Sequence, residues 1–266
     1  MTRVIKVGGR PQSDPALIPA LAAAQHATFL SLSESARASR EGLVVVHGGG
    51  DEVSTLQRLY GVTAEFKGGR RVTSALDIEI IRMALSGSAN KRLVSALVSH
   101  EVRAIGLSGE DAGLIVATPL DPAQFGFVGS LMQVNHDLLE QLLSVGLLPV
   151  ISPVSRCSDP GLGATLNVNG DDAAAAIAIA MEASELLLVS DVAGVLKHGE
   201  AIPMLDADDA QRLIADGTAQ GGMAAKLQAA VKALEGGVER VRISDIAAIE
   251  QLHRGTVLTR VGSVHA

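Results

Sequence analysis

The chain of 266 residues is 47% hydrophobic and 19% charged, which predicts a globular α/β protein of one large domain or two fused lobes. Aromatic residues make up only 2% and the net charge is −7, which argues against nucleic acid and anionic membranes as partners. Cys157 is the single cysteine, which excludes an internal disulfide. With no secretory signal or membrane-spanning apolar run in the sequence, we expect a cytoplasmic protein.

The first residues alternate between predicted strands and helices. A strand at 4–7 precedes a pair of glycines, and residues 11–40 carry one or two helices with a serine-rich, solvated end. A second strand at 43–46 ends at His47, which we expect to be a structural, buried histidine rather than a base. Three glycines follow, and Asp51 can then cap a helix whose apolar face carries Val53, Leu56 and Leu59.

The middle of the chain continues this alternation. Residues 64–72 show no helical spacing of apolar residues, which predicts a hairpin or an exposed loop. Ser74 and Asp77 resemble a capping box that opens a helix with Ile78, Ile81, Met83 and Leu85. Further elements are a helix at 90–100, strands at 104–107 and 114–118, a hairpin strand at 125–134, a helix at 137–145 and a strand at 148–151.

The last part of the chain begins with an alanine-rich helix that runs from Asp172 to near Glu182. A buried strand at 186–189, helices at 208–216 and 224–234, and a last strand at 240–243 follow, before a short helix and a tail. Right-handed crossovers would make most strands of such a chain parallel, with ligand loops at their carboxyl ends. The fold class predicted from this alternation is α/β, with a mostly parallel central sheet.

The turn after the second strand is the strongest site signal. A buried strand, the three glycines Gly48, Gly49 and Gly50, and a helix N-terminus together predict a cradle for a phosphate or carboxylate. A plain strand-to-helix turn is the alternative interpretation. The sequence contains no G-x-x-x-x-G-K-[ST], no G-x-G-x-x-G after its first strand and no H-E-x-x-H, so the usual phosphate-loop, dinucleotide and zinc-protease signatures are absent.

Several charged residues stand near strand ends or helix starts. Lys6 lies inside a short apolar strand before Gly8 and Gly9, which favours an anion contact over an edge lysine facing water. Arg71 either grips a carboxylate or is a solvated loop cation. Lys226, early in a helix, opposes the helix dipole unless an anion lies nearby, and a surface lysine is equally compatible.

Three further polar residues, Asn167, Asn169 and Asp171, cluster where a strand meets a helix, and helix capping accounts for only one of them. Asp172 adds a second carboxylate, whose negative charge the dipole at the helix N-terminus would stabilise.

Six motifs in this order resemble the amino acid kinase family over nearly the whole chain, and within it the acetylglutamate kinases. They are Lys6-Val7-Gly8-Gly9, Val46-His47-Gly48-Gly49-Gly50, Gly69-Arg70-Arg71-Val72-Thr73, Asn167-Val168-Asn169-Gly170-Asp171, Ser190-Asp191-Val192-Ala193-Gly194-Val195 and Gly222-Met223-Ala224-Ala225-Lys226. The resemblance implies a three-layer α/β/α sandwich. It also implies an acceptor-binding lobe at 1–182 and a nucleotide-binding lobe at 183–266 that share one sheet.

The resemblance also implies a reaction, in which ATP phosphorylates the side-chain carboxylate of N-acetyl-L-glutamate, as in arginine biosynthesis. Lys6 and Lys226 would stabilise the transferred phosphoryl group, with Asp171 holding both lysines. The acceptor side would comprise Gly8, Gly9, Gly48, Gly49, Gly50, Arg71, Asn167 and Asn169. The nucleotide side would comprise Asp191, Val192, Ala193, Gly194, Val195, Leu196, Thr218, Gly222 and Met223. Mg²⁺ would be held mainly by the nucleotide phosphates, with no metal site on the protein.

The chain departs from the family pattern at Arg10 and at Gly68-Gly69-Arg70. It starts almost at Lys6, without the N-terminal helix of arginine-regulated hexamers, so we expect an arginine-insensitive homodimer. Two alternatives stay open. One is a kinase for aminoadipate attached to an acidic carrier protein, which could dock on Lys67, Arg70 and Arg71. The other is a non-catalytic nucleotide-binding module of the same fold.

Overall fold

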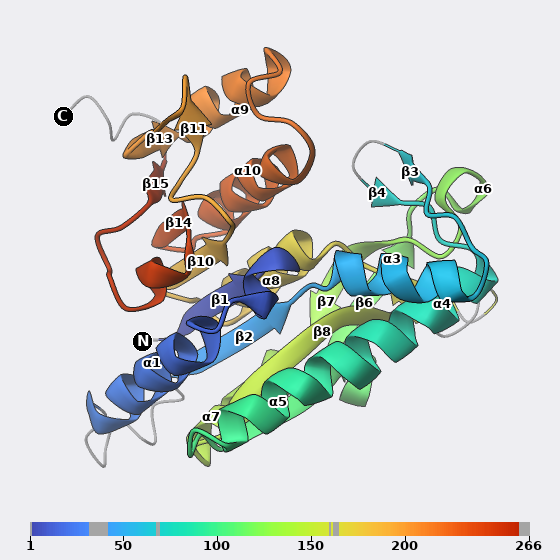
Figure 1. The fold of residues 1–266 in the computed structure, drawn as a ribbon, viewed down its shortest axis with the longest axis horizontal. Helices are drawn as coiled ribbons and strands as arrows, with labels where there is room; N and C mark the ends of the chain where they lie inside the picture. The colour runs from blue at the N-terminus through green and yellow to red at the C-terminus, as the bar shows by residue number, and fades with distance from the viewer. Residues whose placement is uncertain (1, 32–41, 68–69, 160, 162–164, 261–266) are drawn as a thin grey trace.

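The computed structural model describes residues 2–31, 42–67, 70–159, 161 and 165–260 (Figure 1). Within these ranges an eleven-stranded sheet forms the centre of the molecule. Its strands are β1 (Arg3–Val7), β2 (Leu43–His47), β5 (Ala104–Gly109), β6 (Ile115–Pro119), β7 (Gly129–Val134), β8 (Leu148–Cys157), β9 (Thr165–Asn167), β10 (Glu185–Val189), β13 (Met204–Asp206), β14 (Arg240–Ser244) and β15 (Thr256–Thr259).

The sheet is mostly parallel, in the order β13-β15-β14-β10-β1-β2-β8-β6-β7, with β5 and β9 also paired to β8. The antiparallel pairs are β14 with β15, β6 with β7 and β8 with β9. Two small antiparallel hairpins lie outside the sheet: β3 (Phe66–Lys67) with β4 (Arg70–Arg71), and β11 (Leu196–Lys197) with β12 (Glu200–Ala201).

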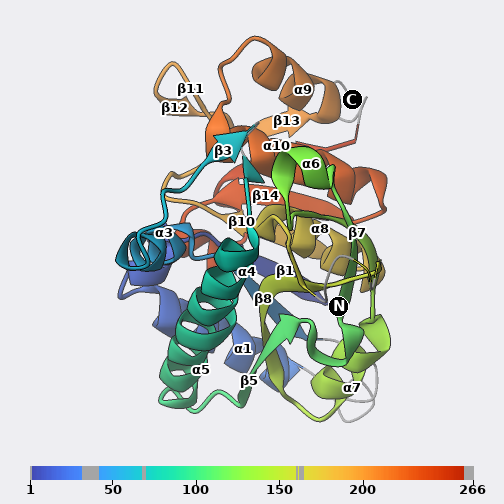
Figure 2. The same cartoon turned by 90° about the vertical axis from the view of Figure 1, so that its right-hand side faces the viewer.

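Helices cover both faces of the sheet (Figure 2). The α-helices are α1 (Leu17–Ser31), α3 (Gly50–Leu59), α4 (Ala75–Ile81), α5 (Asn90–Val98), α6 (Pro122–Phe125), α7 (His136–Ser144), α8 (Gly170–Ala180), α9 (Ala207–Ala215) and α10 (Gly221–Glu235). A π-helical segment, η2 (Arg82–Ala89), joins α4 to α5, and the 3₁₀ turns are η1 (Arg10–Ser13), η3 (Asp111–Gly113) and η5 (Ile246–Ile249). No described helix is long and apolar enough to cross a membrane.

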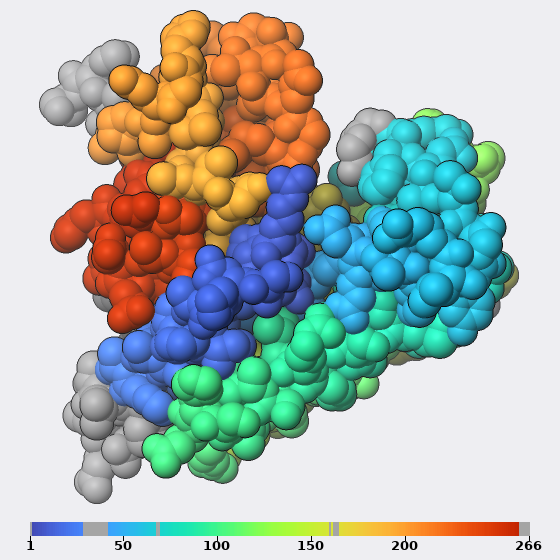
Figure 3. Space-filling model, in the orientation of Figure 1, coloured from blue at the N-terminus to red at the C-terminus, as the bar shows by residue number. Residues whose placement is uncertain are grey.

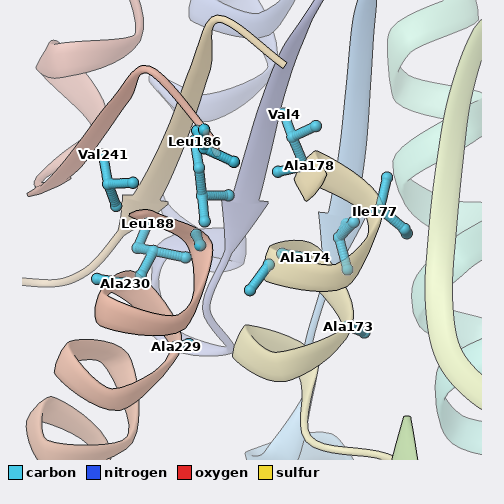
Figure 4. Close-up of a cluster of buried hydrophobic side chains, with 14 of the residues drawn as sticks. Val4, Ala173, Ala174, Ile177, Ala178, Leu186, Leu188, Ala229, Ala230 and Val241 are labelled. Atoms are coloured by element: carbon cyan, nitrogen blue, oxygen red, sulfur yellow. The ribbon is translucent and has the colours of Figure 1, made fainter. Parts of the chain in front are cut away.

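The alternation of side chains along β1 explains the three layers. Val4 packs in a cluster with residues of α7, α8 and α10, which Figure 4 shows around Leu186 and Ala174. Ile5 and Val7 point to the opposite face, into a cluster with α1, α5 and η5. Successive strand residues face opposite sides of a sheet, so Lys6 shares the face of Val4. The predicted three-layer α/β/α sandwich is confirmed.

The amino ends of the central strands are held by a buried ionic cluster. Glu185 accepts from Arg3 Nε at 2.8 Å and from Arg242 Nε at 2.6 Å, and Arg242 is completely buried. Arg242 also donates through Nη1 to the backbone carbonyls of Gln251 and Arg254 and through Nη2 to that of Ala248. This cluster joins β1, β10 and β14 at the end of the sheet opposite the glycine turns.

Most predicted elements are confirmed, and the differences are local. Asp51 does not cap α3: the cap position is Gly49, and Asp51 lies in the first turn. Leu59, the last residue of α3, is 78% exposed and not part of the predicted apolar face. The strand predicted at 125–134 begins only at Gly129, since Pro122–Phe125 forms a helical turn.

The C-terminal part is richer in strands than predicted. Arg240–Ser244 is not the last strand of the sheet, because β15 pairs with it and β13 pairs with β15. The helix predicted at 224–234 starts earlier, at Gly221. The predicted serine-rich connection lies in residues 32–41, outside the described residues.

Candidate active site

Two glycine turns meet at the carboxyl ends of β1 and β2. The N–H of Gly48 donates to Val7 O at 2.9 Å, and a Cβ on Gly9 would lie 3.4 Å from Gly50 N. Gly49 has φ = +152°, and a Cβ there would lie 2.7 Å from a Leu85 methyl carbon, so only glycine fits without displacement. The turns therefore present backbone to the space above them, as the predicted cradle requires.

His47 supports this turn from below. It is fully buried, and burial lowers its pKa to about 4, so the ring is neutral at physiological pH. Its Nδ1 lies 2.9 Å from Gly48 O, where it donates, and its Nε2 accepts from Asn90 Nδ2 at 3.1 Å. Both nitrogens are thus engaged, and the expected structural histidine is confirmed.

Three charged side chains converge beside the turns. Lys6 Nζ lies 2.7 Å from Asp171 Oδ1, and Lys226 Nζ donates to Asp171 Oδ2 at 3.3 Å. The exposed fractions of the three residues are 6%, 4% and 8% for Lys6, Asp171 and Lys226. They come from β1, the first turn of α8 and the second turn of α10, so the fold assembles them from distant parts of the sequence.

The electrostatics of this triad favour an added anion. Burial raises the pKa of Asp171, but the charges of Lys6 and Lys226 outweigh it, and the pKa falls below its ordinary value. Burial and the charge of Lys6 lower the pKa of Lys226, despite the attraction of Asp171. Two ammonium groups share one carboxylate, which leaves an excess positive charge in a largely dry position. A bound anion would relieve the repulsion between the lysines.

One pocket, which we call the acceptor pocket, opens on the Asp171 side of the triad. It encloses about 240 Å³. Its lining comprises Lys6, Gly9, Gly48, Gly49, Gly50, Val53, Phe66, Arg70, Arg71, Ile81, Leu85, Val128, Pro153, Asn167, Val168, Asn169, Gly170 and Asp171. A lining that combines cations, amides and backbone donors with apolar side chains suits a small carboxylic acid that carries an apolar group.

Arg71 enters the acceptor pocket from the β3–β4 hairpin. Its guanidinium donates to Gln57 Oε1, to Ser54 Oγ at 3.0 Å and to Gly50 O at 3.2 Å, and it lies 4.6 Å from the centre of the Phe66 ring. Gln57 in turn donates to Asp77, whose carboxylate accepts from Ser74 N in the predicted capping box. These contacts fix the guanidinium at the pocket wall.

Asn167 and Asn169 have different structural roles. Asn169 caps α8, with its Oδ1 accepting from Asp171 N at 2.8 Å, and so positions the carboxylate that holds the lysines. Asn167 ends β9, and its Nδ2 donates to Thr73 Oγ1 at 3.1 Å. Both line the acceptor pocket. The capping interpretation is therefore correct for Asn169, whereas Asn167 takes no part in the cap.

A second pocket, which we call the nucleotide pocket, opens on the Lys226 side and encloses about 490 Å³. Its lining comprises Gly8, Gly9, Arg10, Pro11, Val189, Ser190, Asp191, Val192, Leu196, Thr218, Gln220, Gly222, Met223 and Lys226. In Figure 3 the surface is hollowed between the orange C-terminal segments, which contribute to the nucleotide pocket, and the cyan segment, which contributes to the acceptor pocket, with the dark blue N-terminal segment beside the hollow. The two pockets share Gly9 and have the lysine–aspartate triad between them.

The structure brings most of the predicted site residues to these pockets, but Gly8, predicted on the acceptor side, lines the nucleotide pocket, and three residues lie elsewhere. Ala193, Gly194 and Val195 are not in the lining: Val195 is buried, and a Cβ on Gly194 would lie 2.7 Å from Thr256 Oγ1. Gly170 was not singled out, yet a Cβ there would lie 3.3 Å from Lys6 Cε. Its place directly before Asp171 was the available signal. The apolar lining residues Phe66, Ile81, Leu85 and Val128 carried no signal beyond hydrophobicity.

Comparison with known proteins agrees with this geometry. The model of the amino acid kinase family matches residues 1–245. An acetylglutamate kinase of Chloroflexus aurantiacus (strain J-10-fl) is 41% identical over 249 residues, which cover 92% of each chain. One from Geobacillus sp. (strain WCH70) is 38% identical over 98% of each chain.

Among solved structures, smu.665 from Streptococcus mutans UA159 superposes with a TM-score of 0.83 and 27% identity, covering 97% of this chain and 98% of that one. With the family model and near-full-length relatives in agreement, the chain belongs to the amino acid kinase family.

Proposed function

We propose that this protein transfers the γ-phosphoryl group of ATP to the side-chain carboxylate of N-acetyl-L-glutamate, which makes it an acetylglutamate kinase. The relatives that match nearly its whole length carry that name. The observation that carries the proposal is the position of the Lys6–Asp171–Lys226 triad between two pockets, one suited to a small acid and the other larger.

The chemistry needs no general base. A carboxylate with a pKa of about 4.3 is already ionised at neutral pH and attacks the γ-phosphorus as it stands. The barrier is electrostatic, because an anion approaches a phosphoryl group whose charge spreads over its equatorial oxygens in the transition state. Lys6 and Lys226 would contact those oxygens, and the backbone N–H groups of the glycine turns would supplement them.

The acceptor is proposed to bind by its own carboxylate and amide groups. Arg71 would pair with the carboxylate that does not react, since a guanidinium held at a pocket wall is suited to a bidentate contact. The amide nitrogen of Asn167 donates to Thr73, and its amide oxygen would accept from the acetylamino N–H. The apolar side chains Phe66 and Val128 line the same pocket and would accommodate a methyl group.

The nucleotide is proposed to bind along Asp191, Val192, Leu196, Thr218, Gly222 and Met223, with its phosphates directed toward Lys226. Mg²⁺ would be held mainly by those phosphates, because both oxygens of Asp171 already accept from lysines. Ala193, Gly194 and Val195 would act on the nucleotide only by shaping the loop that carries Asp191.

The lining residues support the division into lobes that we propose. All residues of the acceptor pocket lie within 1–182, and the nucleotide pocket takes most of its lining from 183–266, with only the loop after β1 contributed by the first lobe. The alternative of a carrier-linked acceptor gains no support, because the cations it would need have partners in the chain. Lys67 pairs with Glu65, Arg70 with Asp172, and Arg71 turns inward.

We further propose a homodimer. Leu76, Met83 and Val98 are large apolar side chains that stay exposed along the helical run from α4 through η2 to α5, and a second copy would cover them. Light scattering on the purified protein should give twice the mass of the chain. The cytoplasmic location stays a prediction from the sequence.

A direct assay tests the activity. The purified protein is incubated with MgATP and N-acetyl-L-glutamate, and the acyl phosphate is trapped with hydroxylamine while ADP release is followed. Equal amounts of N-acetyl-L-aminoadipate and free L-glutamate serve as comparison acceptors. We expect turnover to be fastest with N-acetyl-L-glutamate. No turnover with it, or faster turnover with the aminoadipate derivative, would contradict the proposal.

A further inference from the structure

Arg10 lies at the mouth of the nucleotide pocket and has no part in the function proposed above. It follows Gly9 directly as the first residue of η1, and its Nη1 donates to Asp191 Oδ2 at 2.6 Å. This ion pair connects the loop after β1 with the loop after β10 across the pocket. Both side chains are open to solvent, with exposed fractions of 77% for Arg10 and 47% for Asp191.

Stability alone gives a weak reason for this ion pair. Exposed ion pairs of this kind contribute little to stability, because solvent screens them and ordering two side chains costs entropy. The same guanidinium can therefore leave Asp191 at small cost when a stronger anion enters. Asp51, in the first turn of α3, also lies close enough to favour the charge of Arg10.

The charge of the pocket gives a functional reason. Among its described lining residues the cations are Arg10 and Lys226, and Lys226 is bound to Asp171 at the inner end. A nucleoside triphosphate carries several negative charges along its chain, and only its terminal phosphate would lie at the triad. Arginine binds phosphate with two parallel hydrogen bonds, which suits a residue at the outer part of that chain.

We infer that Arg10 binds a phosphate of the nucleotide that is not transferred, and exchanges Asp191 for that phosphate when the nucleotide enters. This inference rests on the proposed function. Arg10 is then a nucleotide-affinity residue that acts from the outer side of the pocket, whereas Lys226 acts at its inner end.

The test compares ligands with and without phosphates. Binding of ATP, ADP and adenosine is measured by calorimetry for the natural protein and for Arg10→Ala and Arg10→Lys. A hydrogen bond to a charged group contributes more to binding than a neutral one, so Arg10→Ala should weaken ATP and ADP binding about 10- to 100-fold. Adenosine binding and the KM for N-acetyl-L-glutamate should not change, and Arg10→Lys should recover part of the loss.

Two controls separate the alternatives. Arg212→Ala removes a similarly exposed ion pair, with Asp209, away from the pocket lining and should leave nucleotide binding unchanged. In an Asp191→Asn background, Arg10→Ala should still weaken ADP binding, because the phosphate contact does not depend on Asp191. Loss of the effect in that background, or equal weakening of adenosine and ADP, overturns the inference. Failure of the natural protein to bind ATP would contradict the proposed function instead.

Discussion

Lys6 and Lys226 contact the same buried carboxylate, although one lies on the first strand of the sheet and the other on the last long helix. The carboxylate of Asp171 keeps the two ammonium groups close together before any substrate arrives. Such preorganised charge lowers the barrier most in a site from which water is largely excluded. The arrangement therefore has the geometry of a phosphoryl-transfer centre without a phosphate-loop lysine.

Removing either lysine should abolish most turnover. We expect Lys6→Ala and Lys226→Ala each to lower kcat by about 100-fold or more, because each removes a fixed charge from the transition state. Lys232→Ala, on the exposed side of α10, is the matched control and should keep full activity. The measurement is steady-state kinetics on folded protein, checked by circular dichroism. Turnover near that of the natural protein in either active-site variant would exclude its assigned role.

The pH dependence of the enzyme activity should reflect the deprotonation of Lys226. Its pKa is lowered from 10.5 by burial and by the charge of Lys6. The ammonium form is the active one, so activity should be full below this lowered pKa and decline as pH rises through it. The decline in kcat/KM for ATP, which reports the free enzyme, should thus begin below pH 10.5. In Lys226→Arg any residual activity should lack this decline, and a flat profile for the natural protein would disprove the interpretation.

Arg71 should determine acceptor affinity. Arg71→Ala removes the proposed partner of the second carboxylate, and we expect the KM for N-acetyl-L-glutamate to rise about 10- to 100-fold while the KM for ATP stays constant. Arg58→Ala, an exposed arginine on α3, is the control. A proportional rise in both KM values would indicate a general disturbance of the site instead of a lost contact.

The buried cluster at the other end of the sheet should dominate stability. Replacing Glu185 by Gln leaves Arg242, which is fully buried, without its counter-charge. Breaking a buried pair in this way costs about 3–5 kcal/mol of unfolding free energy. Urea denaturation should show it as a lower midpoint, with Glu200→Gln on the exposed β12 as the control. A midpoint within error of the natural protein would mean that water reaches Arg242.

Strong local patterns made much of the fold predictable. β2 and β10 each contain four consecutive apolar residues, β1 is apolar except for Arg3 and Lys6, and the capping box at Ser74 has a fixed sequence form. The turns and short strands were harder to predict from the sequence. β11, β12 and β13 have only two or three residues each, so no period can develop in them. The start of α10 was obscured by Gly221 and Gly222, which are poor helix formers.

The candidate site was predictable where a charged side chain occurs in an unfavourable local environment. A lysine in an apolar strand and a lysine opposing a helix dipole both demand an explanation, and both lie at the triad. Their common partner was not evident from the residues alone, since pairing across strands and helices depends on the order of the sheet. For the same reason, the sequence did not distinguish the apolar residues that line the acceptor pocket from residues of the hydrophobic core. Ala193, Gly194 and Val195 share a motif with Asp191, but Val195 is buried in the core and the close approach of Thr256 leaves no room for a Cβ on Gly194.

The position of Lys6 also ties the alignment of β1 to activity. In the folded protein Lys6 lies opposite Val46 of β2 and Leu188 of β10. A shift of β1 by one residue would turn Lys6 toward α1 and α5 and present an aliphatic side chain to Asp171. Such a chain could still be compact and helical but would be inactive. Enzyme activity recovered after refolding would therefore report only the molecules in which β1 is correctly aligned. Circular dichroism would report the correctly aligned and the misaligned molecules together.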